Sequence, residues 1–263
     1  MSKFHDGEKR TLRVMSLNKV IPNILTLMAL AAGLTSMRFA LQEQWEHSAL
    51  AVAVAAILDA LDGRVARLLK GASKFGAELD SLSDFVCFGV APAIILYLWS
   101  LQDSGRWGWI ACMLFTMACG LRLARFNVAS DDKKKPVWAH TFFTGVPAPA
   151  GAGVVLLPLI LSFLFGKQFL HQPSIVIAWL LFAGGLLVST IPTFSFKTNR
   201  IPKSWMLPFM LLVAVFAAFI INKPWWILAA LIILYMISIP FSYRRHKLLT
   251  SRKQSTMGKS KKS

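Results

Sequence analysis

Residues 59–84 read DALDGRVARLLKGASKFGAELDSLSD, and the rest of the chain is organised around them. The stretch contains four aspartates: Asp59, Asp62, Asp80 and Asp84. The first two are three positions apart along the chain and the last two are four positions apart, so the members of each pair share one face of an α-helix. The spacing therefore predicts two helices, each carrying a pair of carboxylates.

A short break between the two pairs predicts a helical hairpin. Gly71 is typical of a residue that ends a helix, and Ser73 is typical of one that caps the next helix. The hairpin would bring the two pairs of carboxylates face to face.

Carboxylates this close repel one another unless cations lie among them. Hard divalent cations such as Mg²⁺ and Mn²⁺ prefer carboxylate oxygen, and a pair of them assists displacement at phosphorus. A single aspartate could be a solvated helix end, and the set could be an ion-paired cluster. However, an aspartate inside a membrane span costs about 2.5–3.5 kcal/mol, and strongly apolar segments flank these four. The pattern therefore favours a two-metal site.

Small residues in the same stretch suggest a bound group beside the carboxylates. Gly63 and Gly76 have no side chain, so a bulky group can approach the backbone there. Arg67 follows within about one turn of that face and could hold a phosphate.

The stretch resembles the signature of the CDP-alcohol phosphatidyltransferase family, D-x-x-D-G-x-x-A-R-x8-G-x3-D-x3-D, at every position. The resemblance implies that the four aspartates bind two divalent metals, Mg²⁺ or Mn²⁺, and that Asp84 acts as general base. It assigns the CDP moiety of the substrate to six residues: Asp62, Gly63, Ala66, Arg67, Gly76 and Asp80.

Composition indicates a membrane protein. The chain has 263 residues, of which 56% are hydrophobic, and its mean hydropathy is +0.56. Its net charge is +17 although only 16% of its residues are charged. No soluble basic domain is apparent, so anionic lipid is a better partner than nucleic acid. The three cysteines lie in apolar segments and predict neither disulfides nor a metal site.

The hydropathy pattern predicts an all-α, polytopic bundle of about eight spans. A basic arm (1–18) precedes the spans and a basic tail (243–263) follows them. The family resemblance implies that the first six spans (19–203) form the catalytic core, so the last two (204–242) are an addition. We expect the spans at about 20–40, 47–69, 77–100, 106–126, 146–166, 173–193, 204–222 and 224–242.

The positions of the basic residues predict the orientation. Of the 29 lysines and arginines, 25 lie in the N-terminal arm, the aspartate hairpin, the connections after spans 4 and 6, and the tail. The positive-inside rule then places both termini and the aspartates on the cytoplasmic side of the cell (inner) membrane.

A second polar stretch follows span 4. Arg122 and Arg125 lie on neighbouring positions of one helix face, with Asn127 beyond them. They are either ordinary positive-inside charge or an anion site beside the aspartates, which would bind the carboxylate of an acceptor. The prolines of Thr144-Gly-Val-Pro147-Ala-Pro149 could start the next helix or shape a mouth over the site.

Several short segments resemble the integral-membrane phosphatidylserine synthase branch of the family. They are Ile21-Pro22-Asn23 with Thr26, Ser81 to Pro92, Arg122 to Asn127, and Thr144 to Pro149. The resemblance implies transfer of the phosphatidyl group of CDP-diacylglycerol to L-serine, which gives phosphatidylserine and CMP, in a homodimer embedded in membrane lipid. It gives spans 7 and 8 no catalytic role.

Two alternatives remain open. The aspartate signature is shared by relatives that use glycerol 3-phosphate, inositol phosphate or choline as acceptor. A cation transporter could also line a pathway with carboxylates. Spans 1, 5, 6, 7 and 8 carry no Asp, Glu or His at depth, and this argues against a transporter.

Overall fold

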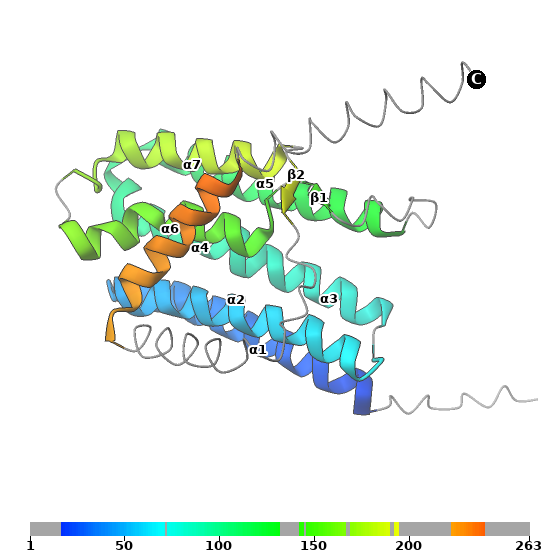
Figure 1. Cartoon of the computed structure of the whole chain (residues 1–263). Helices are drawn as coiled ribbons and strands as arrows, with labels where there is room; N and C mark the ends of the chain where they lie inside the picture. The colour runs from blue at the N-terminus through cyan, green and yellow to red at the C-terminus, as the bar shows by residue number, and fades with distance from the viewer. Residues whose placement is uncertain are drawn as a thin grey trace, which may run out of the picture.

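The computed structural model describes residues 17–71, 73–131, 142–144, 146–166, 169–189, 192–194 and 222–239, and it is helical apart from two short strands (Figure 1). The prediction of an all-α fold is thus confirmed, with one small exception. The helical elements are α1 (Leu17–Leu41), α2 (Trp45–Leu68), α3 (Lys74–Asp84), η1 (Phe85–Val90), α4 (Ala91–Leu96), η2 (Tyr97–Leu101), η3 (Gln102–Ser104), α5 (Arg106–Asp131), α6 (Ala148–Phe165), α7 (Pro173–Val188) and a last helix, Pro224–Ile239.

The exception is a pair of antiparallel strands, β1 (Phe142–Thr144) and β2 (Pro192–Phe194). They join the chain just before α6 to the chain just after α7. The sixth span was expected to continue to residue 193, but α7 ends at Val188. Pro192 cannot donate a backbone hydrogen bond to a helix and disfavours helix before it.

The predicted third span is one continuous helix, Lys74–Ser104, but it is not regular. Two of its segments, η1 and η2, are widened into π-helix. Pro92 lies just beyond η1 and removes a backbone donor there. Side chains of α5 donate to carbonyl groups on either side of Pro92: Thr116 to Gly89 at 3.3 Å and Cys112 to Ala93 at 3.4 Å. Neighbouring helices thus supply hydrogen bonds that the irregular helix lacks.

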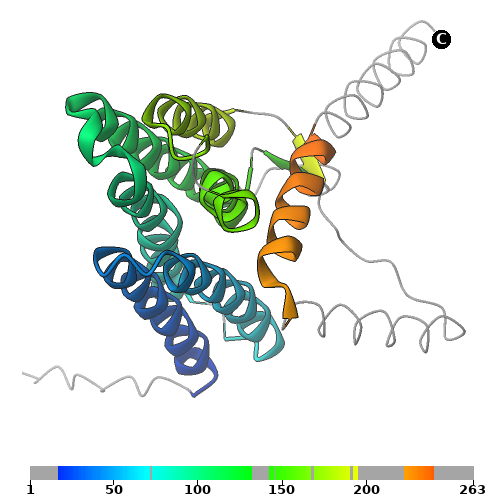
Figure 2. The ribbon, with the colours of Figure 1, turned by 90° about the vertical axis from the view of Figure 1, so that its left-hand side faces the viewer.

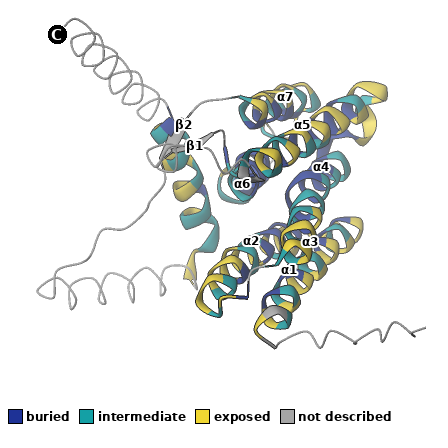
Figure 3. Cartoon of the chain, turned by 90° about the vertical axis from the view of Figure 1, so that its right-hand side faces the viewer, coloured by how far each residue is buried: buried dark blue, intermediate teal, exposed yellow. Residues whose placement is uncertain are grey.

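The Lys74–Ser104 helix lies between two groups of helices. Its segments contact α1 on one side and α5 on the other, while α1 packs on α2 and α5 packs on α7. Most of α4 is buried, and so is most of α6 (Figure 3).

The outer surface of the bundle is apolar. Large hydrophobic side chains are exposed along α1, α2 and α5, including Ile24, Leu34, Ile57 and Met117. Within the described residues, four helices are long and apolar enough to cross a membrane: Val20–Leu41, Lys74–Ser104, Arg106–Ala129 and Ala148–Phe165. Helix α2 is as long but carries the charged motif, and α7 and Pro224–Ile239 are shorter. The count of eight spans is therefore not established. Residues 204–221 of span 7 lie outside the described residues, and so do residues 1–16 of the N-terminal arm and the whole tail, 243–263.

Small residues allow the helices to approach closely. A Cβ atom at Gly33 of α1 would lie 2.5 Å from the Sγ atom of Cys87 and 3.1 Å from its Cα atom. A Cβ atom at Gly89 would lie 3.1 Å from Cβ of Cys119 on α5. Packing without side chains at such points is typical of helices in membranes.

We expect Gly33→Ala to lower the unfolding midpoint (Tm) in detergent, because the new methyl group overlaps Cys87. Overpacking of this kind costs about 1–3 kcal/mol. The matched control is Gly185→Ala in α7, where nothing lies within 4 Å of a new Cβ atom. Equal Tm values for the two variants would contradict the packing described above.

Candidate active site

The predicted hairpin is present as α2 and α3. Ser73 caps α3 as expected, and its Oγ atom accepts a hydrogen bond from the backbone N–H of Gly76 at 3.0 Å. The end of α2 differs in detail from the prediction. The residue in the left-handed conformation is Lys70, with φ of 51°, and the N–H of Gly71 donates to the carbonyl of Ala66 at 2.9 Å. This hydrogen bond, which spans five residues, closes the helix one residue earlier than predicted.

The hairpin brings the predicted carboxylates together. Asp59, Asp62 and Asp80 each offer a carboxylate oxygen, and these oxygens lie within 4.8 Å of one another. Asp84 lies close enough to Asp59 and Asp80 to interact electrostatically with both. Asp62 is buried, and the other three are partly buried. A cluster of partly desolvated oxygen ligands suits hard divalent cations such as Mg²⁺ and Mn²⁺, so the residues present fit the implied metals.

Asp62 is oriented by a residue of α1. The Oγ1 atom of Thr26 lies 2.6 Å from Oδ2 of Asp62 and 3.1 Å from the carbonyl oxygen of Pro22. The hydroxyl carries one proton, and the carboxylate is the nearer and more strongly charged acceptor. Thr26 is itself buried, so this hydrogen bond is shielded from water.

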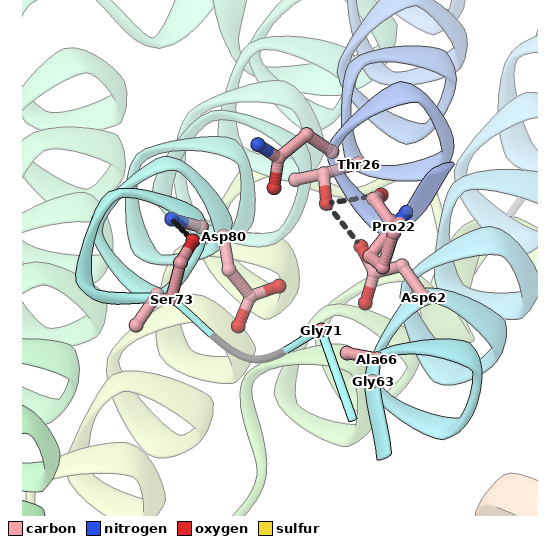
Figure 4. Close-up of a pocket in the computed structure, with 11 residues that line it drawn as sticks. Pro22, Thr26, Asp62, Gly63, Ala66, Gly71, Ser73 and Asp80 are labelled. Carbon is pink, nitrogen blue, oxygen red and sulfur yellow. Dashed lines mark hydrogen bonds between the residues drawn. The ribbon is translucent and has the colours of Figure 1, made fainter. Parts of the chain in front are cut away.

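A pocket opens beside the carboxylates (Figure 4). Five of the six residues predicted for the CDP moiety line it: Asp62, Gly63, Ala66, Gly76 and Asp80. The sixth, Arg67, does not line the pocket. Its exposed side chain folds back, and its Nε atom donates to the carbonyl of Gly63 at 2.9 Å.

The two glycines of the pocket differ. Nothing lies within 4 Å of a Cβ atom built at Gly63, so the backbone there is open to a ligand. A Cβ atom at Gly76 would lie 2.9 Å from Oδ1 of Asn23 and 3.1 Å from Oγ of Ser73. Gly76 therefore allows Asn23 of α1 to pack against α3.

The pocket also contains residues that the sequence reasoning gave no role in a site. Pro22, Asn23 and Thr26 come from α1, while Gly71, Ser73 and Ala77 come from the hairpin. The Pro22-Asn23 pair with Thr26 belongs to a segment that resembles the phosphatidylserine synthase branch. Its spacing was a usable signal, because positions 22, 23 and 26 lie on one face of a helix.

Arg122 of α5 lies near the carboxylates. Its Nε atom donates to the backbone carbonyl of Val146, which precedes α6. Its charge lies close enough to Asp84 to interact with it. The guanidinium carries five N–H donors, so this hydrogen bond leaves capacity for an anion.

Arg125 and Asn127 have other contacts. The two terminal nitrogens of Arg125 donate to the carbonyls of Val188 and Ser189 at 3.0 and 3.1 Å, at the end of α7. The Nδ2 atom of Asn127 donates to Oγ of Ser81 at 2.9 Å and so joins α5 to α3. Both contacts hold the helices around the site together.

Comparison with known proteins identifies relatives. The model of the CDP-alcohol phosphatidyltransferase family matches residues 19–192, and a model described as CDP-alcohol phosphatidyltransferase 2 matches residues 204–240. The CDP-diacylglycerol–serine O-phosphatidyltransferase of Mycobacterium leprae is 38% identical over 246 residues, which cover 94% of this chain and 81% of that protein. The protein of the same name from Helicobacter pylori (strain 26695) is 33% identical over 218 residues, which cover 83% and 88%. That of Bacillus subtilis is 36% identical over 151 residues, which cover 57% and 79%.

We expect Thr26→Val to weaken the binding of Mn²⁺ by about tenfold or more, because groups that orient a metal ligand typically contribute 10–100-fold to affinity. Titration of the purified protein with Mn²⁺ measures this. Thr35→Val is the matched control in α1, since the Thr35 hydroxyl donates only to the carbonyl of Ala31 among the described residues. Unchanged affinity in Thr26→Val would mean that the hydrogen bond to Asp62 does not orient a metal ligand.

Proposed function

The chain belongs to the CDP-alcohol phosphatidyltransferase family, and we propose that it transfers the phosphatidyl group of CDP-diacylglycerol to the hydroxyl of L-serine, which gives phosphatidylserine and CMP. The observation that carries the chemistry is the convergence of the aspartate carboxylates beside a pocket with an open backbone at Gly63. The choice of serine rests on relatives of that name, which match most of the chain.

The aspartates have two roles in this proposal. Asp59, Asp62, Asp80 and Asp84 would hold two divalent cations, Mg²⁺ or Mn²⁺, which supply positive charge at the pyrophosphate when bound. The pocket residues place the CDP moiety beside them. Gly63 and Ala66 leave room for the nucleotide against α2, and Arg67 is close enough in sequence to swing toward a phosphate.

Asp84 is the general base of the proposed reaction. A serine hydroxyl is a poor nucleophile at neutral pH and needs a base within hydrogen-bonding reach. The Asp84 carboxylate takes the hydroxyl proton, and the serine oxygen forms a bond to the phosphorus that carries the diacylglycerol. The bond from that phosphorus to the oxygen of CMP breaks, and CMP leaves with the electron pair.

Arg122 lies on the acceptor side of the site. Its positive charge interacts electrostatically with Asp84, so a serine whose hydroxyl faces Asp84 would place its carboxylate toward the guanidinium. Arg125 and Asn127 complete the surroundings by holding α5 against α7 and α3.

The proposed location is the cell (inner) membrane, with several spans and with both termini and the site facing the cytoplasm. The distribution of basic residues supports this orientation. It lets the lipid donor enter from the bilayer and serine from water. The family resemblance also implies a homodimer, which stays a prediction.

Purified protein supplied with CDP-diacylglycerol and Mg²⁺ or Mn²⁺ should release CMP with serine. It should not do so with glycerol 3-phosphate, inositol phosphate or choline. Asp84→Asn should lower kcat by at least about 100-fold, because a general base contributes 10²–10⁴-fold.

The matched control for this assay is Asp103→Asn, since Asp103 is exposed near the other end of the same helix. Release of CMP with a different acceptor would support the proposed chemistry but show that serine is not the acceptor substrate. No metal-dependent release with any acceptor would favour the transporter alternative.

Arg122→Ala should raise the KM for serine about tenfold or more and change the KM for CDP-diacylglycerol far less, because a charge-assisted hydrogen bond to the acceptor is lost. Arg125→Ala should act in the same direction but more weakly, and should also lower Tm, because its guanidinium donates to the end of α7. Steady-state kinetics with each substrate varied separately measures both. If neither arginine affects the serine KM, the acceptor does not bind here.

A further inference from the structure

The last described helix, Pro224–Ile239, packs on α6. The ring of Trp225 lies 4.7 Å from that of Phe163 on α6, centroid to centroid, and Trp226 lies 5.6 Å from Phe165. A Cβ atom at Gly153 of α6 would lie 3.3 Å from Ile232. Figure 2 shows this helix in orange alongside the green α6. The C-terminal segment is therefore a packed part of the protein.

This helix carries Tyr235, one of two residues with an unpaired buried side-chain atom in the described part of the chain. Its hydroxyl is buried and has no hydrogen-bond partner among the described residues. Tyrosine hydroxyls usually find a partner when they are buried, because the lost bond to water is costly. The hydroxyl is thus free to donate to, or accept from, a bound molecule.

The packing of the last helix places Tyr235 toward the start of α6. Trp225 lies against Phe163 near the end of α6, whereas Ile232 lies against Gly153 nearer its start. The two helices therefore run in opposite directions, and Tyr235, about one turn beyond Ile232, lies toward the start of α6.

Arg122 reaches the same end of α6, where its Nε atom donates to the carbonyl of Val146. The charge of Arg122 interacts electrostatically with Tyr235 and with Asp84. A hydroxyl and a guanidinium on the same side of a site suit a carboxylate ligand, since both can donate to it.

We propose that Tyr235 is a specificity-determining residue, whose hydroxyl binds the carboxylate of the amino-acid acceptor together with Arg122. This inference rests on the proposed function and extends it to the C-terminal segment, to which the family resemblance gives no catalytic role. The separate family match of residues 204–240 includes Tyr235. The C-terminal segment would then contribute directly to binding of the acceptor.

The test is Tyr235→Phe in the full-length protein, which removes the hydroxyl and keeps the ring. We expect the KM for serine to rise about tenfold, because the loss of one hydrogen bond to a charged group typically weakens binding by about that factor. The kcat and the KM for CDP-diacylglycerol should stay within about twofold of the unaltered protein. Tyr97→Phe is the matched control, because Tyr97 lies 13 residues beyond Asp84, about 20 Å along the same helix.

The outcomes separate this inference from the proposed function. If the unaltered protein releases no CMP with serine, the proposed function fails. If it does, and Tyr235→Phe has an unchanged serine KM, the role of Tyr235 is wrong while the proposed function stands. A parallel loss of kcat and of both affinities would mean that Tyr235 only supports the packing, and would also overturn the inference.

Discussion

Repulsion among four neighbouring carboxylates is the constraint around which this protein is arranged. Asp59 and Asp62 on α2 face Asp80 and Asp84 on α3, and none of the four is fully exposed to water. Such a cluster is stable only if positive charge or donated hydrogen bonds offset the repulsion and the loss of hydration. The protein itself supplies a hydroxyl from α1 on one side and a guanidinium from α5 on the other. Divalent cations would supply the rest.

Close packing determines where Asp84 lies. The residue directly precedes the π-helical segment η1, which passes between Gly33 of α1 and α5 with little space for side chains. The irregular segment turns the following residues by a different angle from an α-helix, and Pro92 prevents regular hydrogen bonding there. The base of the proposed reaction is therefore held by a backbone that its neighbours keep in place.

The acceptor side is built from elements that are distant in sequence. Arg122 reaches the chain before α6, Arg125 holds the end of α7, and the last helix, which carries Tyr235, packs on α6. The nucleotide side, by contrast, is built mostly from one hairpin and α1. In the proposed reaction, this division would separate the chemistry shared by the family from the part that selects an acceptor.

Sequence alone predicted the helical hairpin, the facing carboxylates, the Ser73 cap and several of the residues that line the pocket beside the carboxylates. These features depend on spacing along a helix of 3.6 residues per turn, so they can be read from local sequence. Only the tertiary structure decided that Thr26 orients Asp62, that Arg67 folds away from the pocket, that Lys70 rather than Gly71 closes α2, and that the helix carrying Tyr235 packs on α6. The conformation of a long side chain and the contacts between distant helices depend on packing across the whole bundle, and no local pattern in the sequence encodes them.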